Sequence, residues 1–155
     1  MQRCKGFSLI ELLVVVILIG IICAVAGLNL VNYTINKNLR SAARDVASDF
    51  AICKERAISE STTYRITFVN GGNSYTIQNV GNPPGPVVPK RLSEFGKDIV
   101  IQNADFGGGP QVDFFARGAV SALGEDNVVL ENSRHSTAKI TVSMTGRTYV
   151  KFDIK

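Results

Sequence analysis

An uninterrupted apolar run near the N-terminus constrains this 155-residue chain more than any other feature. Between Leu12 and Leu28 the sequence contains no charged residue, and the run begins directly after one carboxylate, Glu11. Residues 7–31 would form about 37 Å of helix, which is enough to cross a hydrocarbon core of about 30 Å. One ionised side chain in hydrocarbon costs roughly 2.5 to 3.5 kcal/mol. Glu11 therefore requires a partner or a function.

Composition leaves three interpretations of this N-terminus open. Arg3 and Lys5 could form the basic region of a secretory signal that is cleaved after residues 24–26, although the apolar stretch is longer than the roughly 7 to 15 residues of such signals. The stretch could also be an ordinary single-span anchor, with Arg3 and Lys5 holding a short N-terminus in the cytoplasm. The third interpretation accounts for the carboxylate as well.

The stretch from Gly6 to Glu11, followed by LLVVVILIG, resembles the processing and assembly signature of type IV pilins and type II secretion pseudopilins. The match includes a short basic leader, residues 1–6, and the Gly, Phe, Ser, Leu and Glu of the motif. The resemblance implies that a prepilin peptidase cuts after Gly6, on the cytoplasmic side, and methylates the new N-terminal residue, Phe7. Glu11 would then serve assembly.

Electrostatics agrees with this role for Glu11. The amine exposed at Phe7 by cleavage would lie one helical turn from the carboxylate, and a helix N-terminus favours an anion. In a filament, the same carboxylate could pair with the amine of a neighbouring subunit and so define the register of assembly. A carboxylate that merely snorkels to the membrane interface is the alternative, but it leaves the flanking motif unexplained.

The apolar spacing becomes helical from Ile35 to Ala57, which predicts an amphipathic helix with one stripe to bury. No proline occurs between residues 7 and 61, so the anchor (7–31) and the amphipathic segment (32–61) are expected to form one helix of about 80 Å. Its weakest part is the Gly- and Asn-containing stretch 27–38, where local melting is plausible.

From residue 62 the pattern changes to the alternating period of strands. TYRITFV and SYTIQNV flank the turn residues NGGN and predict a hairpin, whereas GNPPGPVVPK (81–90) predicts an exposed loop. Further strands are expected at 98–102, 111–115, 127–131, 137–143 and 148–155. The sequence thus predicts an α+β fold. A long N-terminal helix, transmembrane in its first half and amphipathic in its second, packs on an antiparallel β-rich domain, residues 62–155.

The second half of the chain also looks like the GspH/FimT type of minor pilins and pseudopilins. This resemblance is carried by the helix tail from Arg44 to Ile58, the turn region from Phe114 to Gly118 and the closing strand pair around Gly146-Arg147. It implies a structural subunit of a type IV pilus or a type II secretion pseudopilus, anchored in the bacterial inner membrane with its globular domain in the periplasm. The implied partners are other pilin subunits, the prepilin peptidase, the inner-membrane assembly platform and the lipid bilayer.

DNA binding is the alternative function, because some minor pilins of the FimT type capture DNA through a basic C-terminal tail. The closing strand would place Arg147, Tyr149, Lys151 and Lys155 on one face, where cations could meet phosphates and the ring could stack on a base. The DNA-capturing members resemble one another in a Gly-Arg-x-Arg pattern, and this chain has Tyr149 in place of the second arginine. An ordinary solvated strand face explains the same residues.

No catalytic or cofactor-binding constellation accompanies these features. His135 is the sole histidine and no G-x-S-x-G elbow accompanies it, while the triplet 107–109 lacks the GK[ST] of a phosphate loop. The three cysteines have no metal-ligand spacing, and no D-x-D-x-D run indicates calcium. Without the leader, 15 basic residues face 13 acidic ones, an excess too small to indicate a nucleic-acid binder. We therefore expect no enzyme activity, no cofactor and no metal.

Overall fold

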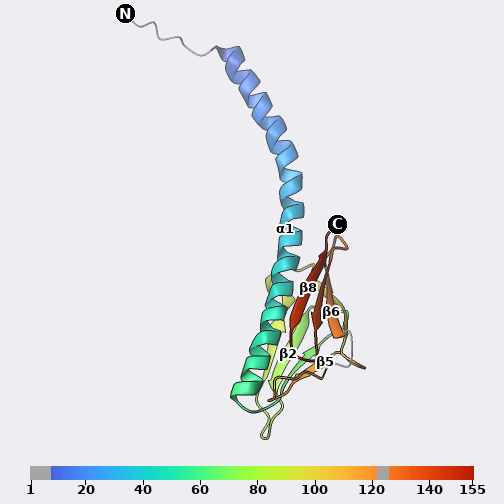
Figure 1. The fold of residues 1–155 in the computed structure, drawn as a ribbon. Helices are drawn as coiled ribbons and strands as arrows, with labels where there is room; N and C mark the ends of the chain where they lie inside the picture. The colour runs from blue at the N-terminus through green and yellow to red at the C-terminus, as the bar shows by residue number, and fades with distance from the viewer. Residues whose placement is uncertain (1–7, 122–125) are drawn as a thin grey trace, which may run out of the picture. The chain divides into compact units, whose positions relative to one another are not determined.

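The structure, a computed structural model, describes residues 8–121 and 126–155, apart from the side chains of residues 25–32. The chain divides into two compact units, one up to Thr34 and one from Ile35 to Lys155. Helix α1 (Leu9–Ser59) contributes to both units, and the described strands, β1 to β8, all lie in the second (Figure 1). The α+β class predicted from the sequence is confirmed.

Helix α1 is one uninterrupted α-helix of 51 residues. The Asn-containing stretch 27–38 shows no interruption of the helix, although its residues are poor helix formers. The helix ends where Ser61 adopts a φ of 50°, and the Glu60 amide donates the last helical hydrogen bond to the Arg56 carbonyl at 2.9 Å. The predicted end near Glu60 is therefore confirmed.

Two four-stranded antiparallel sheets make up most of the second unit. Sheet A has the strand order β3-β2-β1-β5 and contains β1 (Tyr64–Phe68), β2 (Ser74–Asn79), β3 (Val87–Arg91) and β5 (Gln111–Phe114). Sheet B has the order β4-β6-β7-β8 and contains β4 (Val100–Asp105), β6 (Asp126–Glu131), β7 (Thr137–Val142) and β8 (Thr148–Asp153). A short 3-10 helix, η1 (Leu92–Glu94), follows β3.

The turn of the β1–β2 hairpin joins the two sheets. The Gly71 amide donates to the Ile101 carbonyl at 2.8 Å, and the Ile101 amide donates to the Gly72 carbonyl at 2.7 Å. Gly71 has a φ of 74°, a conformation that suits glycine and few other residues. The NGGN stretch therefore makes the predicted hairpin and also connects sheet A to β4 of sheet B.

Strand β3 corrects one sequence-based expectation. The proline content predicts a loop over residues 81–90, but β3 begins within this stretch at Val87 and pairs with β2. Pro89 lies opposite Thr76, and β3 is the outermost strand of sheet A. An outermost strand needs hydrogen-bond donors on one side only, so it tolerates a proline. The prolines exclude an inner strand, as expected, but they do not exclude a strand.

The second half of α1 forms one wall of the hydrophobic core. The buried face of the helix is the stripe that the periodicity predicts, with residues 39, 42, 46, 50, 53 and 57 all buried. At its centre, the Phe50 ring lies 6.0, 6.3 and 5.7 Å from the rings of Phe68, Phe106 and Phe114. These rings belong to β1, to the residue after β4 and to β5, so Phe50 packs against both sheets.

A buried polar cluster, which the sequence analysis missed, ties α1 to sheet A. Asp49 is only 5 % exposed, accepts a hydrogen bond of 2.6 Å from the Tyr75 hydroxyl and lies 3.1 Å from the Lys90 ammonium. Burial raises the pKa of Tyr75, and the hydrogen bond to Asp49 raises it further. Tyr75 therefore remains a hydrogen-bond donor, and Lys90 compensates the charge of the carboxylate.

Candidate assembly site

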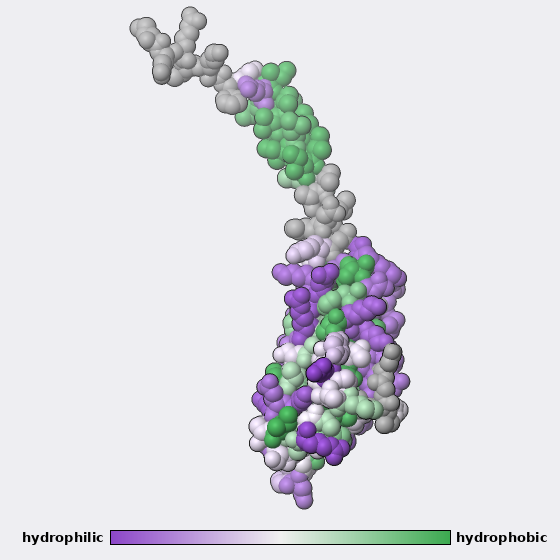
Figure 2. All heavy atoms as spheres, viewed as in Figure 1, coloured by the Kyte–Doolittle hydropathy of each residue, from purple (hydrophilic) through white to green (hydrophobic). Residues whose placement is uncertain are grey.

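The N-terminal part of α1 presents apolar side chains on every side of the helix. Each large aliphatic residue from Leu9 to Ile22 is exposed, and the smallest exposed fraction among them is 46 %, at Val15. Figure 2 shows this part of the chain as a continuous hydrophobic stretch. A water-soluble monomer rarely exposes so large an apolar surface. The segment is therefore suited to a lipid or protein environment.

Glu11 is the single charged residue between residues 9 and 24, and it lies in the first turn of α1. Its side chain is exposed. The Ser8 carbonyl accepts hydrogen bonds from the amides of Glu11 and Leu12 at 3.0 and 3.2 Å, which marks the start of the helix. Here the helix dipole stabilises an anion, and Ser8 and Glu11 have the spacing of a capping box. The carboxylate position is thus compatible with a nearby positive charge.

The predicted processing residues, Gly6 and Phe7, lie outside the described residues. Cleavage after Gly6 and methylation of Phe7 therefore remain predictions. Within the part of the chain that the structure describes, no helix combines the length and the hydropathy that a membrane crossing requires. The predicted span, residues 7–31, also remains a prediction.

The residues predicted for DNA binding gather along β8. Tyr149 and Lys151 are exposed, and the residues between and beside them are half-buried, so the strand alternates as predicted. Arg147 directly precedes β8 and Lys155 follows it, and both are exposed. Because β8 is the outermost strand of sheet B, all four residues lie along one edge of the sheet.

The charges around this edge are mixed. Lys151 is in register with Lys139 of β7, which brings two cations to neighbouring strands. Asp153 is exposed on the same face as Lys151. The backbone of Lys155 is held in place, because its amide donates to the Ser136 hydroxyl at 3.0 Å. The structure thus brings the four predicted residues together, but an acidic group accompanies them.

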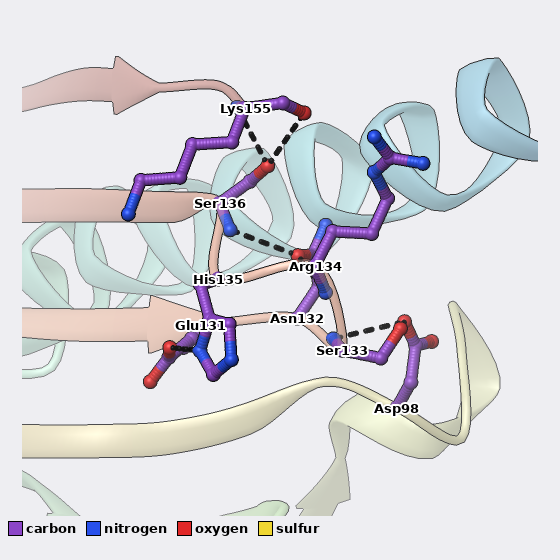
Figure 3. Close-up of polar contacts among 8 residues, drawn as sticks. All are labelled: Asp98, Glu131, Asn132, Ser133, Arg134, His135, Ser136 and Lys155. Atoms are coloured by element: carbon purple, nitrogen blue, oxygen red, sulfur yellow. Dashed lines mark hydrogen bonds and ion pairs between the residues drawn. The ribbon is translucent and has the colours of Figure 1, made fainter.

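The connection between β6 and β7 docks the C-terminal end of the chain onto α1. The Asn132 amide group donates to the side-chain oxygen of Asn36 on α1 at 3.1 Å, and Asn36 in turn donates to the Lys155 carbonyl at 3.4 Å. Asn132 also accepts a hydrogen bond of 3.1 Å from the Ser136 amide (Figure 3). Asn132 and Ser136 are buried, so this contact is a fixed part of the fold.

The described residues offer no evident catalytic chemistry. His135 is exposed, and its Nδ1 lies 2.7 Å from the Glu131 carboxylate. Burial raises the pKa of the Cys53 thiol to about 12, so the reactive thiolate is scarce at neutral pH. Within residues 8–121 and 126–155, no group of three His, Cys, Asp or Glu side chains could hold a metal ion.

Two protein-family models match this chain, one over its N-terminal part and one over most of the remainder. Residues 1–27 match the model of the prokaryotic N-terminal methylation motif. Residues 42–146, most of the chain, match the model of the type II transport protein GspH. The chain belongs to the GspH family. This confirms the resemblance to type IV pilins and pseudopilins of the GspH/FimT type that the sequence suggests, whereas a comparison with curated proteins gave no match.

Solved structures share the fold of this GspH-family chain. The minor pseudopilin EpsH from the type 2 secretion system of Vibrio cholerae aligns with a TM-score of 0.60 and 11 % identity, over 74 % of this chain and 97 % of EpsH. The type IV minor pilin FimU of Pseudomonas aeruginosa strain PAO1 aligns with a TM-score of 0.57 and 14 % identity, over 77 % of this chain and 92 % of FimU. The fold is thus common to a secretion system and a pilus.

Proposed function

We propose that this GspH-family chain is a minor pilin or pseudopilin that assembles by its N-terminal helix into a type IV pilus or a type II secretion pseudopilus. The exposed apolar surface of α1 from Leu9 to Ile22 carries the proposal. Such a surface suits both a bilayer and the interior of a helix bundle. Transfer between these two apolar environments costs little hydrophobic free energy, which suits a subunit that leaves the membrane to join a filament.

In this proposal Glu11 neutralises the amine of Phe7 after cleavage following Gly6. The position of Glu11 in the first turn of α1 supports the pairing, because the helix dipole already favours an anion there. In the membrane the pair would form within one subunit, and in the filament it would form between neighbours. The same carboxylate would then contribute to the register of assembly.

The remaining parts of the proposal follow from the family. The apolar segment would anchor the subunit in the bacterial inner membrane, and the second unit, Ile35–Lys155, would lie in the periplasm. The prepilin peptidase, the inner-membrane assembly platform and other pilin subunits would be its partners. In this proposal the chain is a structural subunit and not an enzyme. The β-sheets would face outward from the filament and determine its contacts.

The mature N-terminus tests the proposal directly. We expect the protein isolated from membranes to begin at Phe7 and to carry one extra methyl group on its N-terminal amine. N-terminal sequencing combined with mass spectrometry of the intact chain measures both. A start at Gly27 would indicate a conventional secreted protein, and an intact Met1 would indicate a plain membrane anchor. Either result contradicts the proposed processing.

DNA binding through β8 is the alternative, and it makes a different prediction. One observation favours it, namely that Lys139 of β7 lies beside Lys151 and widens the basic edge. Because Asp153 accompanies these cations, we expect the detergent-solubilised chain to pass through a duplex-DNA column without retention. Retention at about 50 mM salt that is lost by about 200 mM would establish DNA binding. Arg147→Gln and Lys151→Gln together would then abolish it.

A further inference from the structure

Three cations form an exposed stripe on α1 at the start of the second unit. Lys37, Arg40 and Arg44 are spaced three and four residues apart, so they share one face of the helix, and all three are exposed. The Arg40 guanidinium carbon lies 5.5 Å from the centre of the Phe152 ring, which holds this side chain against β8. The sequence contains no acidic residue from Leu12 to Arg44.

Like most exposed cations of the second unit, the stripe has no carboxylate partner among the described residues, in contrast to Arg65 and Lys90. Arg65 forms two hydrogen bonds with Asp113, at 2.7 and 2.8 Å, and Lys90 lies 3.1 Å from Asp49. No residue of the stripe forms an ion pair with any of the described residues. Its positive charge is therefore left for a partner outside the chain.

Two acidic side chains at this end of the unit, Asp98 and Glu131, are already engaged, whereas Asp153 of β8 is exposed. Asp98 accepts a hydrogen bond of 2.9 Å from the Ser133 hydroxyl, and Glu131 lies 2.7 Å from the His135 ring nitrogen (Figure 3). Both contacts belong to the β6–β7 connection that docks onto α1. The two carboxylates are thus engaged by residues of the loop.

The C-terminal backbone of the chain lies next to the start of the stripe. The Lys155 carbonyl accepts a hydrogen bond of 3.4 Å from Asn36, the residue immediately before Lys37. We propose that Lys37, Arg40 and Arg44 bind the anionic phospholipid headgroups of the membrane that holds the apolar segment. The inference rests on the proposed function in one respect, because it requires that the apolar segment lies in a bilayer.

Sequence proximity to the predicted anchor favours lipid as the occupant of this surface. Lys37 is the first charged residue after the apolar run, nine positions beyond Leu28. The attraction of cations to anionic lipids decays over roughly a Debye length, about 8 Å at physiological salt, so Lys37, which lies about 9 Å beyond residue 31 at 1.5 Å per residue, would be nearest to the headgroups. Binding would hold the second unit at the bilayer surface until the subunit is extracted. The headgroup contacts would then be exchanged for contacts within the filament.

The test uses the full-length chain with Cys4 and Cys23 replaced by alanine and a single added label site, Ser48→Cys. Ser48 is exposed and lies one turn beyond Arg44, whereas Cys53 is buried and does not compete for the label. The labelled chain is reconstituted in vesicles of phosphatidylcholine, with or without phosphatidylglycerol, that contain a quencher attached to a fraction of the headgroups.

We expect stronger quenching in the vesicles with phosphatidylglycerol, and a return to the phosphatidylcholine level at about 1 M salt. The triple variant Lys37→Gln, Arg40→Gln, Arg44→Gln should lose the difference, because each cation near the surface shifts the ratio of membrane-bound to unbound second unit by roughly fivefold. The matched control, Arg91→Gln, Arg117→Gln, Arg147→Gln, removes the same charge from other exposed positions and should retain it.

Vesicle flotation after an alkaline wash separates the possible failures. If the chain floats with both kinds of vesicle but quenching is the same in both, the anchor holds and the headgroup inference is overturned. Equal loss of quenching in the two triple variants also overturns it, since net charge and not the stripe would be responsible. If the chain does not float at all, the proposed membrane anchoring and this inference both fail.

Discussion

Glu11→Ala is expected to remove the protein from filaments while leaving it in the membrane. Glu11 is the sole charge between Lys5 and Lys37, so no other side chain of the segment can neutralise the amine of the mature chain. Loss of one partner from an ion pair in an apolar bundle reduces the equilibrium constant for assembly by roughly 100-fold or more. Immunoblots of sheared filaments and of the membrane fraction measure the two populations separately.

Two substitutions at the same position separate charge from shape. Glu11→Gln keeps the size of the side chain and should behave like Glu11→Ala, whereas Glu11→Asp keeps the charge and should restore part of the incorporation. Ser8→Ala alters only the possible cap of α1 and should assemble normally. Incorporation of Glu11→Ala at the level of the unmodified chain would show that the carboxylate does not pair with the amine.

Phe50→Ala is expected to reduce the free energy of unfolding of the second unit by about 3 to 5 kcal/mol. Phe50 is 1 % exposed and contacts three aromatic rings from both sheets, so the substitution leaves a cavity that the strands cannot fill without moving. Urea unfolding of residues 35–155 measures this, because the buried core of the described residues lies within that unit.

The control for this prediction is Ser48→Ala, an exposed site on the same helix. We expect a change of less than about 0.5 kcal/mol there, because no buried contact is removed. A change below about 1 kcal/mol for Phe50→Ala would mean that α1 does not pack against both sheets as described, and would contradict the fold.

Local periodicity was sufficient to predict the helix and most of the strands. The 3.6-residue spacing identified the buried stripe that contains Val46 and Phe50, and the alternation around Lys151 identified β8 as a half-exposed strand. Periodicity failed at β3, because the tolerance of Pro89 depends on an outer position in the sheet, which is a tertiary property. The pairing of β1 with β5 is equally nonlocal and has no local signal.

The candidate site residues also differ in whether they have a local sequence signal or depend on tertiary structure. Glu11 was evident from the sequence because an acid inside an apolar run is costly wherever it lies. Asp49 was not, since its partner Lys90 is distant in the sequence and the burial of Asp49 depends on the assembled fold. Lys37, Arg40 and Arg44 were visible as charges on a helix, but their lack of carboxylate partners could be recognised only in three dimensions.

Pro89 in β3 has a consequence for solubility. An outermost strand usually offers free amide groups to which a strand of another molecule can add, and a proline in the middle of that edge has no amide hydrogen to offer. The β3 edge of sheet A is therefore a poor template for aggregation by strand addition. This would hold even at the high local concentration that many subunits in one membrane would produce. If the chain assembles through its helix as proposed, Pro89 keeps neighbouring subunits from pairing instead through the β3 edge of sheet A.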